Sequence, residues 1–149
     1  AGKIGSSIAS ELGTMRISEQ IDALEIMGIN SAAYLVLPKV IAATIMIPII
    51  IIIGAFLQIL SGLVVGHVSN VVTATEFMQG SVQYFIPFTV TFAIIKATTF
   101  GFIISSVSAY LGYYTTGGAL QVGNSATRAV VASCILILVF DYLLAELLL

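Results

Sequence analysis

Charged residues, cysteine, histidine and tryptophan are all scarce in this sequence of 149 residues. Charged residues make up 8% of the chain, whereas soluble domains carry about 25%. The net charge of −2 offers no basic surface, so we expect no nucleic-acid partner. The single cysteine, Cys134, lies within an apolar run and cannot form an internal disulfide. We expect it to be a small buried hydrophobic side chain.

The motifs of common enzymes are also missing. There is no P-loop, no HExxH, no GxSxG, and no serine or cysteine with a histidine partner. The one histidine, His67, has no second potential ligand near it in sequence, which favours a surface position over a metal site. We therefore expect no catalytic residues, no metal and no cofactor bound by this chain. If ATP drives the protein, ATP and Mg²⁺ must bind to another subunit.

Long hydrophobic runs dominate what is present. The chain is 59% hydrophobic and has a mean hydropathy of +1.14, which is typical of an integral membrane protein. Three runs exceed the roughly 20 helical residues that cross a bilayer. We expect an all-α membrane protein in which residues 1–149 form one transmembrane domain. Its expected parts are the end of a preceding helix (1–10), an amphipathic helix (11–28), a first span (35–65), an outer loop (67–86), a second span (87–111), an inner loop (112–128) and a third span (129–149).

Local signals refine these boundaries. Asn30-Ser31 is a plausible cap for the first span, and Pro48 inside that span should bend it. Thr73 and Glu76 form a capping-box pattern, which predicts a short interfacial helix in the outer loop. The third span is expected to be capped at Asn124 or Ser125. Because the chain begins without methionine or a charged-then-apolar leader, we expect no signal peptide and interpret it as a fragment.

The segment 11–28 holds four of the seven acidic residues. Ile17, Ile21 and Leu24 recur at helical spacing, polar residues fill the rest of the circumference, and Gly28 can end the helix. So charged a helix lies outside the bilayer, where it could rest on the membrane surface or dock into a partner protein. Its polar face carries three acids and one arginine, which favours docking over lipid head groups.

Basic residues give the orientation. Four of the five lie on one side of the predicted spans, and the 67–86 loop opposite has none; the four are Lys3, Arg16, Lys39 and Arg128. By the positive-inside rule, the amphipathic helix is cytoplasmic. Tyrosines near the end of the second span fit an aromatic belt at the membrane boundary; they are Tyr110, Tyr113 and Tyr114.

Two charges fall inside the predicted spans. Lys96 is nine residues from the outer end of the second span, about 13 Å deep, and Asp141 lies at a similar depth in the third. A charge at the bilayer centre costs about 3 kcal/mol on insertion scales. Three interpretations remain open: an ion pair that locks the two spans together, a polar lining of a transport path, or snorkelling of Lys96 to the surface.

Small residues recur every four positions along the second span, which predicts a seam where another helix approaches closely; they are Ala93, Ala97, Gly101, Ser105 and Ala109. Gly62 and Gly66 form a GxxxG pattern in the first span, a weaker signal of the same kind.

Taken together, the chain resembles the MlaE-type permease family, the membrane subunits of ABC lipid transporters that work with MCE-domain proteins. The densest match is AGKIGSSIASELGTMRISEQIDALEIMGIN, with its A-G-[KR]-x-G-[SA] start, E-Q pair and terminal M-G. Further matches are Leu37-Pro38-Lys39, Lys96 in Ile-Ile-Lys, Ala126-Thr127-Arg128 and Asp141 in Phe-Asp-Tyr.

The resemblance implies a function. It implies that the E-Q segment is a cytoplasmic coupling helix seated in an ATPase, with contacts from Glu11, Arg16, Glu19, Gln20 and Asp22. It also implies a homodimer, two copies of an ABC ATPase subunit, an MCE-protein hexamer and a phospholipid substrate. The resemblance implies about five spans in the whole protein, so two further spans would precede this chain. It also implies a bacterial inner membrane as the commonest setting, with plastid and actinobacterial relatives as the alternatives.

Two other classes of function remain open. A non-transporting membrane anchor or assembly subunit would use Lys96 and Asp141 only as an internal staple. An ion-coupled secondary transporter would be expected to show internal repeats and matching broken helices, and no repeat is visible here.

Overall fold

The computed structural model describes residues 1–69 and 73–148, and all secondary structure in this part of the chain is helical. The elements are α1 (Gly2–Ile17), α2 (Gln20–Ile26), the π-helix η1 (Ala32–Val36), α3 (Leu37–Val68), α4 (Ala74–Gln83), α5 (Pro87–Tyr113) and α6 (Ala119–Leu148). Residues 70–72 of the predicted outer loop and Leu149 of the predicted third span lie outside the described residues. Within the described part, three helical segments are long and apolar enough to cross a membrane, which confirms the three predicted spans; they are Ala32–Val68, Pro87–Tyr113 and Ala119–Leu148.

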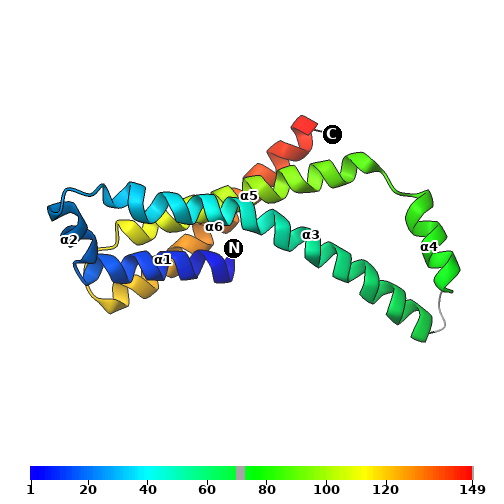
Figure 1. The fold of residues 1–149 in the computed structure, drawn as a ribbon, viewed down its shortest axis with the longest axis horizontal. Helices are drawn as coiled ribbons and strands as arrows, with labels where there is room; N and C mark the ends of the chain where they lie inside the picture. The colour runs from blue at the N-terminus through cyan, green and yellow to red at the C-terminus, as the bar shows by residue number, and fades with distance from the viewer. Residues whose placement is uncertain (70–72, 149) are drawn as a thin grey trace.

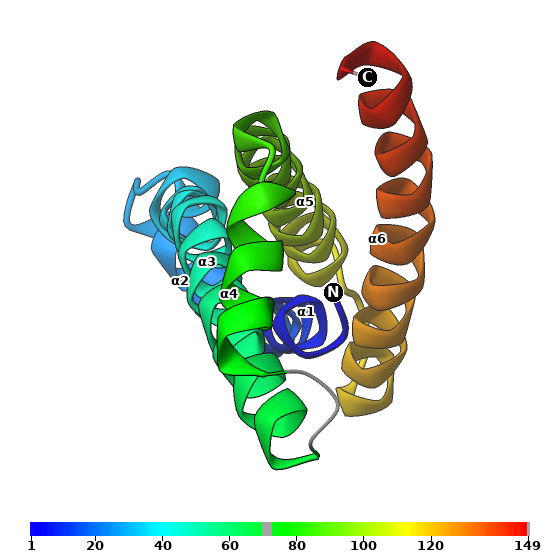
Figure 2. The same ribbon diagram turned by 90° about the vertical axis from the view of Figure 1, so that its right-hand side faces the viewer.

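Helix α5 is the central element, packed against α1, α3 and α6 (Figure 2). Helix α1 runs in the same direction as α5: Gly5 lies against Ser108, and Ala9 lies against Gly112 one turn further on. The approach at the second point is very close, since a β-carbon on Gly112 would lie 2.6 Å from the carbonyl oxygen of Ala9. Small residues therefore allow α1 to pack beside the half of α5 that ends at Tyr113 (Figure 1).

The predicted single helix over 11–28 is wrong. Helix α1 continues without interruption from residue 2 to Ile17, and the chain then turns at Ser18 and Glu19 before α2 begins. Glu19 has a left-handed backbone with φ 59°, a conformation that sequence patterns normally associate with glycine or asparagine. Gly28, with φ 77°, follows the end of α2 as predicted.

The start of α6 also differs from the prediction. The helix begins at Ala119, so Asn124 and Ser125 lie inside it and the connection from α5 is shorter than the predicted inner loop. Gly117, with φ 106°, makes the turn. Packing explains the early start, because Val122 in the first turns of α6 lies buried against Gly13 of α1.

Cys134 on α6 is exposed, and the prediction of a buried cysteine is wrong. Its neighbour Ser133 faces the packed interior and is fully buried. Successive residues on a helix point about 100° apart, so Cys134 points in a different direction from Ser133, away from the packed interior. In a membrane helix the outward position can be as apolar as the inward one, so hydrophobicity alone did not separate them.

Helix α3 follows η1 directly, so the first span is continuous from residue 32. The side chain of Asn30 accepts a hydrogen bond from the Ala33 N–H at 3.1 Å, which confirms the predicted cap. Pro48 lies inside α3. Figure 1 shows that α3 changes direction along its length and then diverges from α5. Proline removes a backbone donor and its ring clashes with the preceding turn, so a bend here is expected.

Helix α4 joins the far ends of α3 and α5 (Figure 1). It begins with a complete capping box: the Thr73 hydroxyl accepts from the Glu76 N–H, and the Glu76 carboxylate accepts from the Thr73 N–H at 3.0 Å. The Thr73 hydroxyl also lies 2.7 Å from the Glu76 carboxylate, and its hydrogen bond, followed by the one from the Thr73 N–H, lowers the pKa of Glu76. The helix predicted in this loop is confirmed. Phe77 of α4 packs against Gly62 of α3, so part of the GxxxG face is occupied by α4.

Candidate functional site

Helix α2 lies at the end of the bundle away from α4, beyond the membrane-spanning parts of α3 and α5 (Figure 1). It has seven residues, and the turns at Glu19 and Gly28 flank it. A helix this short is not stable alone, so tertiary contacts must fix it. Ile21 supplies one such contact, because its side chain is fully buried.

Three of the predicted ATPase-contact residues form ion pairs within the chain. Glu11 on α1 pairs with Lys39 at the start of α3 at 2.5 Å. Arg16 at the end of α1 pairs with Asp22 on α2 at 2.7 Å. These pairs connect α1 to α2 and to α3, so the charged groups of Glu11, Arg16 and Asp22 are engaged within the chain.

The other two predicted contact residues, Glu19 and Gln20, are exposed at the turn that opens α2. The end of the same helix exposes apolar side chains: Ile26 is 88% exposed and Met27 is 65% exposed. This end of the molecule therefore presents acidic, amide and large apolar groups together. Such a mixed surface suits a protein partner better than anionic lipid head groups.

A hydrogen-bond network that sequence reasoning missed links α2 to α5. Ser31 donates to the Glu25 carboxylate at 2.8 Å, and Tyr113 donates to the same oxygen at 3.0 Å. The two hydroxyl oxygens lie 2.6 Å apart, so the three oxygens form a compact triangle. The bond from Ser31, and then that from Tyr113, lowers the pKa of Glu25. Nothing in the sequence pattern joins residues 25 and 113, which are 88 positions apart.

The intramembrane charges pair with each other. Lys96 Nζ on α5 lies 2.6 Å from Asp141 Oδ1 on α6. The ammonium also lies 4.6 Å from the centre of the Phe92 ring, a cation–π contact on its own helix. The Lys96 side chain is 22% exposed and that of Asp141 49%, so the pair sits at the edge of the α5–α6 contact. The ion-pair interpretation is thus confirmed in geometry, while a transport role stays a prediction.

The predicted small-residue seam on α5 packs against other helices over part of its length and lines a groove over the rest. Gly101 lies against α3, since a β-carbon there would be 3.3 Å from Ile47. Ser105 and Ala109 are fully buried. Around Ala93 and Ala97, by contrast, α3 has diverged and the seam lines an open groove.

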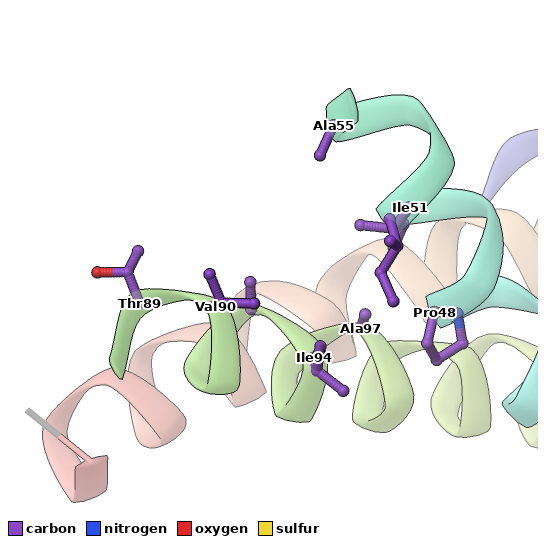
Figure 3. A pocket seen from close by; sticks show the side chains of 9 residues that line it. Pro48, Ile51, Ala55, Thr89, Val90, Ile94 and Ala97 are labelled. Atoms are coloured by element: carbon purple, nitrogen blue, oxygen red, sulfur yellow. The ribbon is translucent and has the colours of Figure 1, made fainter. Parts of the chain in front are cut away.

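This groove between α3 and α5 has a volume of about 220 Å³ and is almost entirely apolar. Figure 3 shows Pro48 and Ile51 from α3 facing Ile94 and Ala97 from α5 across it. Thr89 supplies the one hydroxyl among the residues that line it. A groove of this chemistry can accommodate hydrocarbon but offers no site for a charged group. Among the described residues, no group of histidine, cysteine and acidic side chains could hold a metal ion.

Comparison with known proteins identifies the family. The family model described as Permease MlaE matches residues 1–147. The chain belongs to the MlaE permease family. A "Probable ABC transporter permease protein" of Rickettsia bellii is 46% identical over 147 residues, covering 99% of this chain and 57% of the relative. A protein of the same description from Synechocystis is 40% identical over 146 residues, covering 97% of this chain and 55% of the relative.

A plant protein is also similar to this MlaE-family chain. The chloroplastic protein Trigalactosyldiacylglycerol 1 of Arabidopsis thaliana is 36% identical over 146 residues, covering 98% of this chain and 42% of the relative. The chain thus spans little more than half the length of the bacterial relatives. The match runs through both α2 and the Lys96–Asp141 pair, so these features of the MlaE-family chain lie inside the matched region.

Proposed function

We propose that this chain is part of the permease subunit of an ATP-binding-cassette transporter that moves phospholipid or a related lipid. The lipid would pass between a bacterial inner membrane and a tunnel formed by an MCE-protein hexamer. The permease would act as a homodimer with two copies of a separate ATPase subunit, on which ATP and Mg²⁺ bind. The observation that carries the proposal is the match to Permease MlaE over residues 1–147.

The surface of α2 supports ATPase docking. Glu19 and Gln20 are exposed at the start of this short helix, and Ile26 and Met27 are exposed at its end. An exposed helix of mixed character at the end of a membrane bundle is suited to insertion in a groove of a soluble partner. The basic residues Arg16 and Lys39 lie at this end, which favours its placement in the cytoplasm.

Two observations support a lipid substrate. The groove between α3 and α5 is apolar, and its lining residues belong to two of the candidate membrane spans, so its chemistry suits a hydrocarbon chain. The Arabidopsis relative carries the name of a galactosyl diacylglycerol lipid. Neither observation identifies the head group of the lipid.

A second candidate, a non-transporting membrane anchor, is favoured by one observation. Lys96 and Asp141 are paired at 2.6 Å between α5 and α6, as an internal staple would require. The groove that could hold lipid lies on the α3 side of α5, so the pair and the groove are on different contacts of that helix.

The deciding experiment uses the full-length permease, expressed with its candidate ATPase. Wild type, Glu19→Lys and the control Glu146→Lys are purified, and ATPase co-purification and lipid-stimulated ATP hydrolysis are measured. Glu146 is an exposed glutamate near the C-terminal end of α6, far along the chain from α2. Glu146→Lys therefore makes the same change of charge without changing α2.

We expect Glu19→Lys to lose both association and stimulation while the permease stays folded, and Glu146→Lys to behave as wild type. Unchanged association and activity in Glu19→Lys would show that α2 is not the docking element. If wild type itself neither binds the ATPase nor responds to lipid, the anchor function takes precedence.

A further inference from the structure

The short helix α2 is connected to the membrane bundle through few contacts. Its first turn is held by the Arg16–Asp22 pair, its middle by the buried Ile21, and its last turn by Glu25. The turns on either side have left-handed residues at Glu19 and Gly28, so the backbone itself is not a continuous helix that could hold α2 in line. The orientation of α2 therefore depends on these side chains.

The contact at Glu25 reaches directly to α5. Tyr113 is the last residue of α5, and its hydroxyl lies 3.0 Å from the Glu25 carboxylate. Ser31 is 1% exposed and completes the triangle from the start of the first span. Two hydroxyl protons serve three short oxygen contacts, so at any moment two of the three are hydrogen bonds. Arg16 lies over the Tyr113 ring at 5.9 Å and joins the α1–α2 pair to the same tyrosine.

Helix α5 then connects this end to the rest of the described structure. It lines the groove with α3, and it carries Lys96, which pairs with Asp141 on α6. It also packs against α1 through Gly112. A displacement of the Tyr113 end of α5 would therefore change the positions of the residues that make each of these contacts.

We propose that Glu25, Ser31 and Tyr113 are positioning residues that fix α2 to the end of α5, so that a movement imposed on α2 by the ATPase is passed to α5. The inference rests on the proposed function, because it requires a partner that moves α2. It assigns to these three side chains a role in transmission that is separate from the exposed surface that would bind the partner.

The test compares Tyr113→Phe and Glu25→Gln with the control Tyr114→Phe in the full-length permease with its ATPase. Tyr114 is the adjacent tyrosine and is 64% exposed, so the control removes a hydroxyl from the same region. Three quantities are measured: ATPase co-purification, basal hydrolysis and the increment stimulated by phospholipid vesicles. A purely structural role would lower all three together.

We expect Tyr113→Phe and Glu25→Gln to retain co-purification and basal hydrolysis. The stimulated increment should fall by about fivefold, the factor that corresponds to about 1 kcal/mol, the net contribution of one hydrogen bond. Tyr114→Phe should match wild type. An unchanged increment in Tyr113→Phe, with wild type stimulated normally, overturns the positioning role and leaves the proposed function standing. Absent ATPase binding in wild type overturns the proposed function instead.

A second measurement does not depend on the ATPase. In full-length permease whose native cysteines are replaced, Cys134→Ser among them, spin labels are placed at Met27→Cys and Thr116→Cys. With labelled protomers diluted by unlabelled ones, they report the distance between the end of α2 and the turn that follows α5. We expect one narrow distance distribution, broadened by Tyr113→Phe and unchanged by Tyr114→Phe. An equally narrow distribution in Tyr113→Phe would show that the hydrogen bonds do not fix α2, and would overturn the inference even if that variant assembled poorly.

Discussion

Gly112→Ala is predicted to destabilise the protein because α1 and α5 meet there through backbone atoms. A β-carbon at Gly112 would lie 2.6 Å from the Ala9 carbonyl oxygen, 2.8 Å from its Cα and 3.1 Å from its carbonyl carbon. No side chain can rotate away, so the two helices must separate by several tenths of an ångström.

The magnitude follows from two opposing terms. Replacing glycine by alanine inside a helix is favourable by about 1 kcal/mol. Inserting a methyl group into a closed contact typically costs about 1–3 kcal/mol, and a contact made by backbone belongs at the upper end. We therefore expect the free energy of unfolding to fall by about 2 kcal/mol.

Gly123→Ala is the matched control. Gly123 lies inside α6, and a β-carbon there would meet no atom within 4 Å. Only the favourable propensity term remains, so this variant should be as stable as wild type or slightly more stable. The assay heats the full-length permease in detergent and measures the monodisperse fraction left, with Gly112→Ala expected to lose it at a lower temperature.

Adding Ala9→Gly to Gly112→Ala sharpens the test. All three close atoms of Ala9 belong to its backbone, so removing its methyl group should not restore stability. Two results would refute the close backbone contact between α1 and α5. One is recovery of stability when Ala9→Gly is added; the other is a Gly112→Ala variant that loses its monodisperse fraction at the same temperature as Gly123→Ala.

Three further predictions concern the α1–α5 contact at Gly5, the Lys96–Asp141 pair and the α2 network. A β-carbon on Gly5 would lie 2.9 Å from the hydroxyl oxygen of Ser108, so Gly5→Ala should lower the melting temperature and Ser108→Ala should restore most of the loss in the double variant. Lys96→Met and Asp141→Leu should each destabilise the protein by about 3 kcal/mol by leaving one intramembrane charge. The double variant should recover much of that stability, and additive losses would contradict pairing. The pKa of Glu25 is lowered in the folded protein, so its contribution is complete above its ordinary value of about 4.3 and is lost as pH falls through the lowered value. The α2–α5 spin-label distribution should therefore broaden in acid, and Glu25→Gln should weaken that dependence on pH, leaving the part that comes from the Arg16–Asp22 pair.

Much of the fold could be predicted because it depends on local chemistry. The three spans follow from apolar runs long enough to cross a bilayer, and α4 follows from the Thr73–Glu76 capping box. The fixed rise per residue placed Lys96 and Asp141 at a similar depth in neighbouring spans. Whether the two charges pair stayed open until the structure showed them 2.6 Å apart.

Other features were missed because they depend on contacts between distant segments. The early start of α6 depends on Val122 packing against Gly13, and the break before α2 places the non-glycine residue Glu19 in a left-handed conformation. Propensity disfavours that conformation, so the surrounding contacts must impose it.

The sequence by itself determined that this is a helical membrane protein, that three of its segments can cross a membrane, which charges they contain, and which family it belongs to. Only the tertiary structure decided how α2 is held, because Glu25 and Tyr113 are brought together by the packing of α1 against α5. Hydropathy and helical period are properties of neighbouring residues, whereas a hydrogen bond across 88 positions depends on the position of whole helices.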